Sequence, residues 1–214
     1  MPDLAFRVDT AKMVPFSASP LLALDLEITN EPTAEAIHAI MLQCQVRIDA
    51  VQRAYGPEER ERLGEVFGTP DMWTRSLKGL LWTQTTVLVP RFTARTVVQV
   101  SLPCSIDFNA ATAKYFYGLG GGDVPLILLF SGTVLHAGPD GQLSAAQIAW
   151  TKETPFRLPL KVYKETLEHY HPNCELVSLR RDVFDRLYRY RRSAGLHSWE
   201  DALESLLPAD GATS

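Results

Sequence analysis

Cysteine is scarce in this sequence, and its scarcity excludes two classes of protein. The 214 residues include three cysteines, Cys44, Cys104 and Cys174, separated by 60 and 70 positions. Such spacing gives neither the disulfide framework of a small secreted domain nor a CxxC metal or redox pair. A sparse, odd number of cysteines suits a reducing compartment, so we expect a cytoplasmic protein.

Long apolar runs and a basic charge excess are also missing. The longest run, "PLILLF" at 125–130, is far shorter than the roughly 18 residues that a transmembrane helix needs. The opening "MPDLAFRVDTAKM" lacks the apolar core of a secretory signal. The net charge is −4 and the pI about 5.7, whereas nucleic-acid-binding domains are typically basic. We therefore expect neither a membrane nor a nucleic acid as partner.

The common catalytic motifs are absent as well. The glycines of "YGLGGGDVP" at 117–125 are not followed by the GK[ST] of a phosphate loop, so they predict a tight turn instead. Ser131 in "LFSGTV" lacks the flanking glycine of a nucleophile elbow. The chain has neither an HExxH zinc motif nor an EF-hand loop. No catalytic residue can be named, which favours a non-enzymatic protein.

The first half of the chain does contain a clear alternation of apolar and polar side chains. Residues 24–29 alternate, and residues 40–49 do so over a longer stretch. A period of two over such lengths predicts strands with one face on a core and the other in water. Joined by "EPTAE", these two are expected to be neighbouring antiparallel strands. Further strands are predicted at 83–90, at 96–104, on both sides of the "GPDG" turn within 124–150, and at 155–162.

Two regions carry helical signals instead. The segment 57–79 begins with a proline and acidic residues and has an apolar stripe that ends at Gly68, which predicts a helical insertion. After Lys161, helices are predicted at 163–170, 180–193 and 198–207. The sequence thus predicts a mixed α/β (α+β) fold. It comprises an antiparallel β-sandwich at 1–160, with the helical insertion at about 57–79, and a helical C-terminal cap at 161–214 packed on it as one structural unit.

The sharpest chemical candidate is "HYHPNC" at 169–174, which holds two of five histidines and one of three cysteines. Pro172 disfavours a helical conformation at His171, so the helix should end near His169 or Tyr170. In an extended exit segment His169 and His171 would point to one side, and Cys174 could join them as a ligand of zinc or nickel. No second ligand pair lies elsewhere, which favours a plain helix end whose histidines face the negative end of the helix dipole.

A second candidate site is the arginine-rich helix "RRDVFDRLYRYRR". Arginine and tyrosine are frequent in protein contacts. Val183, Phe184, Leu187 and Tyr188 are expected to seat this helix on the sandwich. The residues that would then remain exposed are Arg189, Tyr190, Arg191 and Arg192, and they are the predicted protein-binding surface. A solvated helix face is the alternative.

The segments "VPLILLFSGTVLH", "WTKETPFRLPLKVYKE" and "LRRDVFDRLYRY", together with the strand "QCQVRID", resemble an uncharacterised bacterial family of unknown function. The resemblance covers nearly the whole chain and supplies no catalytic residues. It implies occurrence beside nickel–iron hydrogenase genes in some bacteria, and therefore an accessory or assembly role.

Three functions are compatible with these observations. The first is a non-enzymatic accessory protein that binds another protein, with a hydrogenase subunit or maturation factor as the implied partner and no cofactor. The second is a metal-binding protein that uses His169, His171 and Cys174. The third is an enzyme or small-ligand binder with a cleft between sandwich and cap. The first is favoured, because the fold signals are strong and no active site can be assembled.

Overall fold

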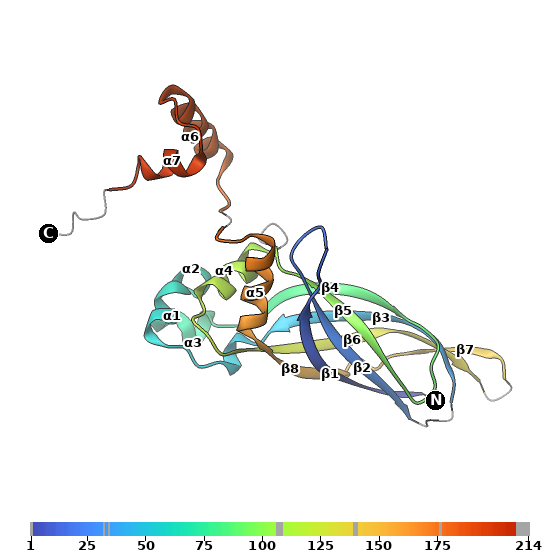
Figure 1. Ribbon diagram of the computed structural model, residues 1–214. Coiled ribbons are helices and arrows are strands. Elements are labelled where there is room, and N and C mark those ends of the chain that lie inside the picture. The colour runs from blue at the N-terminus through green and yellow to red at the C-terminus, as the bar shows by residue number, and fades with distance from the viewer. Residues whose placement is uncertain are drawn as a thin grey trace. The chain divides into compact units, whose positions relative to one another are not determined.

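Two antiparallel sheets form the main body of the protein, as the alternating pattern predicts (Figure 1). The computed structural model describes residues 2–31, 33, 35–105, 109–138, 141–175 and 177–208. The smaller sheet has the order β1-β2-β5, and the larger sheet has the order β4-β3-β6-β7, with β8 also paired to β6. The strands are β1 (Asp3–Met13), β2 (Leu21–Glu31), β3 (Ile37–Ile48), β4 (Leu80–Val89), β5 (Arg95–Pro103), β6 (Asp123–Ala137), β7 (Leu143–Gln147) and β8 (Glu153–Pro159).

The core lies between the two sheets. Alternate residues of β2 and β3 point inward and are fully buried, including Cys44. The ring of Phe6 on β1 stacks on the ring of Phe130 on β6, with centroids 4.1 Å apart, so the two inner faces are in direct contact. As predicted, β6 is central to its sheet, because it pairs with β3, β7 and β8. The predicted fold class, an α+β sandwich, is confirmed.

One expectation about the strands is corrected, and one strand was not predicted. The strands β2 and β3 are not neighbours: β2 pairs with β1 and β5, whereas β3 pairs with β4 and β6 in the other sheet. Alternation specifies which face of a strand is buried, but it does not specify the partner strand. The first strand, β1, was not expected at all. Its register shifts between Val8 and Thr10, which interrupts the period of two that would have revealed it.

Helices α1–α5 gather at one end of the strands (Figure 1). The predicted insertion consists of short pieces, and α5 ends at the residue expected. The helical elements of this unit are η1 (Ala50–Gln52), α1 (Pro57–Arg62), α2 (Gly64–Phe67), η2 (Pro70–Met72), α3 (Trp73–Ser76), α4 (Ala110–Gly118) and α5 (Leu160–Tyr170). Their aromatic side chains close this end of the sandwich. Phe116 and Tyr163 stack at 3.8 Å between centroids, and Trp82 lies edge-on to Phe116 at 4.9 Å.

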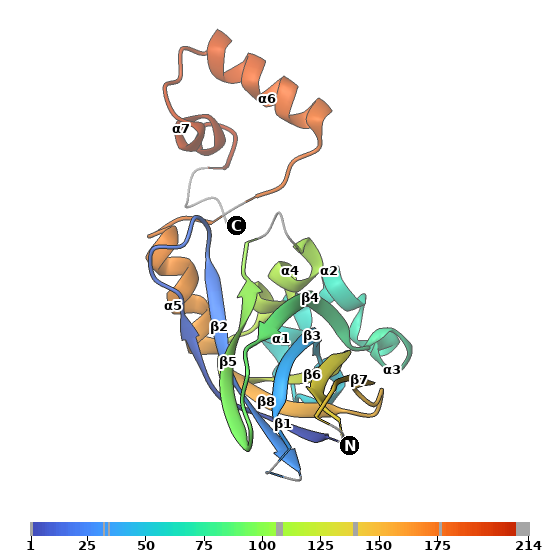
Figure 2. The ribbon, with the colours of Figure 1, turned by 90° about the vertical axis from the view of Figure 1, so that its right-hand side faces the viewer.

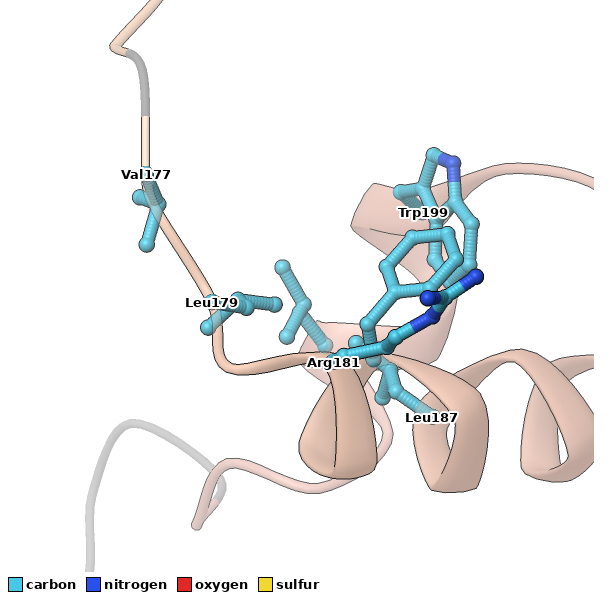
Figure 3. A pocket seen from close by; sticks show the side chains of 7 residues that line it. Val177, Leu179, Arg181, Leu187 and Trp199 are labelled. Carbon is cyan, nitrogen blue, oxygen red and sulfur yellow. The ribbon is translucent and has the colours of Figure 1, made fainter. Parts of the chain in front are cut away.

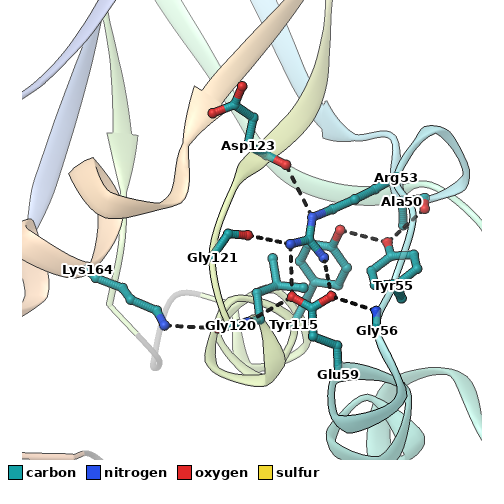
Figure 4. Close-up of polar contacts among 11 residues, drawn as sticks. Ala50, Arg53, Tyr55, Gly56, Glu59, Tyr115, Gly120, Gly121, Asp123 and Lys164 are labelled. Atoms are coloured by element: carbon teal, nitrogen blue, oxygen red, sulfur yellow. Dashed lines mark hydrogen bonds and ion pairs between the residues drawn. The ribbon is translucent and has the colours of Figure 1, made fainter.

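A partly buried ion pair connects the insertion to the glycine-rich turn (Figure 4). Arg53 donates hydrogen bonds to both carboxylate oxygens of Glu59, at 3.1 and 2.9 Å, and further ones to the carbonyl oxygens of Gly121 and Asp123. Glu59 also accepts a hydrogen bond from the Gly120 amide at 2.8 Å. The glycines of this segment therefore serve a structural turn, as predicted.

The chain divides into two compact units, Met1–Cys174 and Glu175–Ser214. Helix α5 belongs to the first unit, where it packs against β1, β2 and β8. The second unit contains α6 (Arg181–Ser193) and α7 (Trp199–Glu204), seen from a second direction in Figure 2. Packing of the helices after position 174 on the sandwich stays a prediction. No helix in the described ranges combines the length and the apolar character needed to cross a bilayer.

Candidate functional site

The second unit is a helical hairpin with almost no interior. Among its described residues, Ala202 is the only one classed as buried. The predicted capping box begins α7: the Asp201 amide donates to the Ser198 hydroxyl at 2.9 Å, and the Ser198 amide donates to the Asp201 carboxylate at 3.2 Å. Large apolar side chains remain exposed, with Phe184 at 43% and Leu203 at 48%. A hairpin of this kind presents apolar surface instead of enclosing it.

An apolar groove of about 360 Å³ opens on this hairpin (Figure 3). It is formed by the extended segment before α6, by one side of α6 and by α7. Among the described residues its lining consists of Val177, Leu179, Arg181, Phe184, Leu187, Trp199 and Leu203, of which Arg181 alone is charged. In Figure 3 the side chain of Arg181 extends toward Trp199. The groove can therefore accept an apolar segment that places a carboxylate near Arg181.

Aromatic contacts and one arginine hold the two helices of the hairpin together. The ring of Trp199 lies 5.3 Å from that of Phe184 and 6.2 Å from that of Tyr188, centroid to centroid. The Arg191 guanidinium carbon lies 4.0 Å from the Trp199 centroid and 5.6 Å from that of Tyr188. A guanidinium over an indole face is a favourable cation–π geometry. Arg191 thereby packs on Trp199, which is one of the residues that line the groove.

The structure separates the four predicted protein-binding residues into two pairs. Arg189 and Arg192 are exposed, and Arg189 donates a hydrogen bond to the carbonyl oxygen of Asp185 in the preceding turn. Tyr190 and Arg191 are half-buried: the Tyr190 hydroxyl is hydrogen-bonded to Ser205 at 3.0 Å, and Arg191 stacks on Trp199. Protein binding by these four residues stays a prediction. The groove was not foreseen, because its wall depends on α7 folding back against α6.

The predicted metal ligands lie at the end of α5, as the proline indicated. His171 caps the helix, and its amide donates to the carbonyl oxygen of Leu167 at 2.8 Å. The Cys174 amide donates to the His171 carbonyl at 3.1 Å, so both residues lie in one turn. The ring of His169 lies edge-on to that of Tyr170, 5.2 Å away. In the described ranges no three His, Cys, Asp or Glu side chains are placed to hold a metal ion. Metal binding by this segment stays a prediction, as does the ligand cleft between sandwich and cap.

The other two cysteines and His136 lie in surroundings that belong to the fold of the sandwich. Cys44 and Cys104 are buried, as expected from their strand positions, and burial raises the pKa of each thiol to about 12. The Nδ1 atom of His136 lies 2.7 Å from a carboxylate oxygen of Glu35. In the part of the chain that the structure describes, none of these three residues forms a metal-holding group with His169, His171 or Cys174.

Tyr170 is the residue of "HYHPNC" whose role the sequence did not reveal. Its hydroxyl donates a hydrogen bond to the carbonyl oxygen of Val14 at 2.7 Å and accepts one from the Ser17 amide at 2.8 Å. Both partners lie in the loop between β1 and β2, which passes beside the end of α5 (Figure 2). The tip of this loop is Phe16, which is fully exposed. In the sequence, the only sign of this loop was a phenylalanine within an uncharged turn segment.

Comparison with known proteins gives a family. No curated protein matches the chain. Among solved structures, one named as a late embryogenesis abundant (LEA) protein shares 11% identity, with 74% of this chain and 72% of that one covered and a TM-score of 0.33. ApaA from Bordetella pertussis shares 17% identity, with 74% and 95% covered and a TM-score of 0.25. For β-glucosidase 3B from Thermotoga neapolitana the identity is 9%, the coverage 73% of this chain and 17% of the enzyme, and the TM-score 0.26.

TM-scores below 0.5 do not establish a shared fold, so these similarities carry no implication for function. The family comparison is different in extent, because one family model matches residues 1–214. The chain therefore belongs to DUF6084, a family of unknown function.

Proposed function

We propose that this protein is a non-enzymatic accessory protein that acts by binding another protein, and that the groove of its C-terminal hairpin is the contact site. The observation that carries the proposal is the groove itself, an apolar hollow on a hairpin in which Ala202 is the one described residue that is buried. Apolar surface that stays exposed to solvent in this way is typical of a surface that another chain covers.

The occupant that fits is an amphipathic helix of the partner with a carboxylate on its flank. Grooves between helices receive apolar side chains spaced along one helix face. Arg181 is the single charge among the described lining residues, so an acidic side chain of the partner would pair with it, whereas a lysine there would be repelled. The family resemblance adds a finer proposal, that the partner is a subunit or maturation factor of a nickel–iron hydrogenase.

Quantitative co-purification from the native host tests the contact site. The informative variant is Leu203→Asp, which puts a charge into the groove; the matched control is Leu143→Asp on β7, where the leucine is 64% exposed and lies in the other unit. We expect a partner recovered with the native chain and with Leu143→Asp, and lost with Leu203→Asp.

The partner found in this way is then purified and titrated against the full chain. Loss of a central apolar contact of an interface weakens binding by roughly 30-fold or more, which corresponds to about 2 kcal/mol. Arg181→Glu should weaken binding and reduce its salt dependence. Equal recovery of every protein with both leucine variants would exclude the groove as the contact site.

A second proposal is metal binding by His169, His171 and Cys174. The supporting observation is that the backbone of Cys174 is hydrogen-bonded to that of His171 and that the Cys174 side chain is exposed, so a thiol and an imidazole lie in one turn. Elemental analysis of untagged protein, followed by titration with zinc and nickel, tests it. Uptake that disappears in a His171→Ala, Cys174→Ser double variant would support the site, and no uptake by the native chain would end the proposal.

A further inference from the structure

Phe16, at the tip of the loop between β1 and β2, is placed unfavourably in two independent respects. Its side chain is 100% exposed, so an aromatic ring that would gain from burial lies wholly in water. Its φ angle is +60°, in the left-handed region where glycine and asparagine are favoured and a bulky side chain is disfavoured. Neither the exposure to solvent nor the backbone conformation favours a phenylalanine at this position.

The loop nevertheless holds this conformation through specific contacts. The Tyr170 hydroxyl bonds to the backbone on both sides of Phe16, at Val14 and at Ser17. The Val14 amide donates to the carbonyl oxygen of Leu21 at 2.9 Å, which closes the base of the loop. Left-handed residues persist where the surroundings over-determine them, and they concentrate at binding sites. The loop backbone that carries Phe16 is thus held in place by the rest of the fold.

We propose that Phe16 is the anchor of a second protein-docking element, independent of the C-terminal groove: an aromatic side chain on a held loop that inserts into an apolar pocket of a partner protein. A backbone that is held before binding loses little conformational entropy when the partner binds, and aromatic residues are frequent among those that dominate interface energetics. Positions 13–20, "MVPFSASP", carry no charged side chain, so the pocket they enter is neutral and apolar.

A protein fits this side chain better than a lipid bilayer does. A whole myristoyl chain, which is far larger than one phenyl ring, gives only marginal membrane binding by itself. Stable peripheral binding needs a second signal such as a cluster of basic residues, and the loop has none. One ring is, however, enough to fill a pocket in a protein surface.

Site-specific photo-crosslinking in the native host tests the proposal. Benzoylphenylalanine replaces Phe16 in the full chain, and the control carries it at Trp150, which is 86% exposed in the turn between β7 and β8 of the same unit. We expect a discrete adduct with one other protein from position 16 and not from position 150. The adduct should persist in the Leu203→Asp background, which separates this element from the groove.

The crosslinked protein is then purified and titrated against variants of the full chain. Phe16→Asn should weaken binding at least about tenfold and leave the urea midpoint unchanged or higher, because asparagine tolerates the left-handed region. Tyr170→Phe, which removes the hydroxyl that holds the loop, should weaken binding less. Trp150→Ala should bind like the native chain.

Three results would overturn the proposal. The first is an adduct pattern that is the same at positions 16 and 150. The second is an adduct of the chain with itself alone, accompanied by a Phe16-dependent dimer in analytical ultracentrifugation. The third is Phe16-dependent flotation with vesicles of phosphatidylethanolamine and phosphatidylglycerol, with no protein adduct.

Discussion

Arg53 and Glu59 form a two-point ion pair in which 9% and 14% of the respective side chains are exposed. The two nitrogen–oxygen hydrogen bonds measure 3.1 and 2.9 Å. Since the same guanidinium also bonds to the carbonyl oxygen of Gly121, the pair ties the start of the helical insertion to the glycine-rich turn before β6. Bidentate, shielded pairs of this kind contribute to stability where exposed ones do not.

Replacing one partner of this pair should destabilise the fold. Glu59→Gln leaves the Arg53 charge shielded and uncompensated, for which we expect a loss of about 2 to 4 kcal/mol in the free energy of unfolding. Urea denaturation at neutral pH measures it. The matched control is Glu58→Gln on the same helix: its side chain is 86% exposed, and its change should stay within about 0.5 kcal/mol. Equal losses in the two variants would contradict the proposed role of the pair.

The contribution of Glu59 should also depend on pH. Burial raises the pKa of its carboxyl, but the Arg53 hydrogen bonds and the amides of Gly120 and Gly56 outweigh that effect, so the pKa is lowered overall. A carboxyl with a lowered folded-state pKa stabilises fully above its unfolded pKa of about 4.3, and the contribution is lost as pH falls through the folded pKa. The stability difference between the native chain and Glu59→Gln should therefore shrink below about pH 4.3. A difference that stays constant to lower pH would show that the charge is not responsible.

The three cysteines should differ sharply in reactivity. Burial raises the pKa of the Cys44 and Cys104 thiols to about 12, whereas Cys174 is exposed. Because the thiolate is the reactive form, a disulfide reagent at about pH 8 should modify one thiol of the native protein rapidly and the other two only after unfolding. Cys174→Ser should abolish the rapid phase. Rapid modification of a second thiol in the native protein would contradict the burial of the sandwich core.

A side chain at position 132 should destabilise the central strand β6. Its φ angle is +134°, and an added Cβ would overlap the carbonyl oxygen of Met41 on the paired strand β3. Gly132→Ala should therefore lower the free energy of unfolding by at least about 2 kcal/mol. Gly64→Ala is the control, because nothing lies within 4 Å of its added Cβ and the helix α2 favours alanine. Similar unfolding midpoints in the two variants would show that the strand adapts at Gly132.

Periodicity predicted the sandwich because burial repeats along each strand. The inward residues of β3 from Ile40 to Ile48 are all fully buried, as their spacing indicated. The partner of each strand was predicted less well, because neighbouring strands in a sandwich need not be consecutive in the sequence. The shift in register after Val8 likewise hid β1, although Leu4 and Val8 are buried. Local patterns report the face of a strand, and only the packed molecule reports its partner.

The candidate sites show the same limit. Pro172 placed the end of α5 correctly, since that end is a local backbone property. The contact of Tyr170 with Val14 spans 156 positions, and no spacing rule connects residues so far apart. On α6 the apolar stripe with Phe184 and Leu187 was visible in the sequence, but the groove exists only because Trp199 and Leu203 face that stripe.

The stacking of Arg191 on Trp199 should stabilise the hairpin more than the charge of Arg191 does. In Arg191→Ala the guanidinium over the Trp199 ring is lost, an interaction worth about 0.5 to 1 kcal/mol at a partly exposed site. Where opening is fast relative to cleavage, this predicts about two- to fivefold faster chymotrypsin cleavage within 175–208. Arg192→Ala is the matched control, because Arg192 is an exposed cation in the same last turn of α6 that favours the helix dipole equally. Equal acceleration in both variants would assign the effect to charge. Acceleration in Arg191→Ala alone, with an intermediate rate for Arg191→Lys, would assign it to the planar guanidinium that stacks on Trp199.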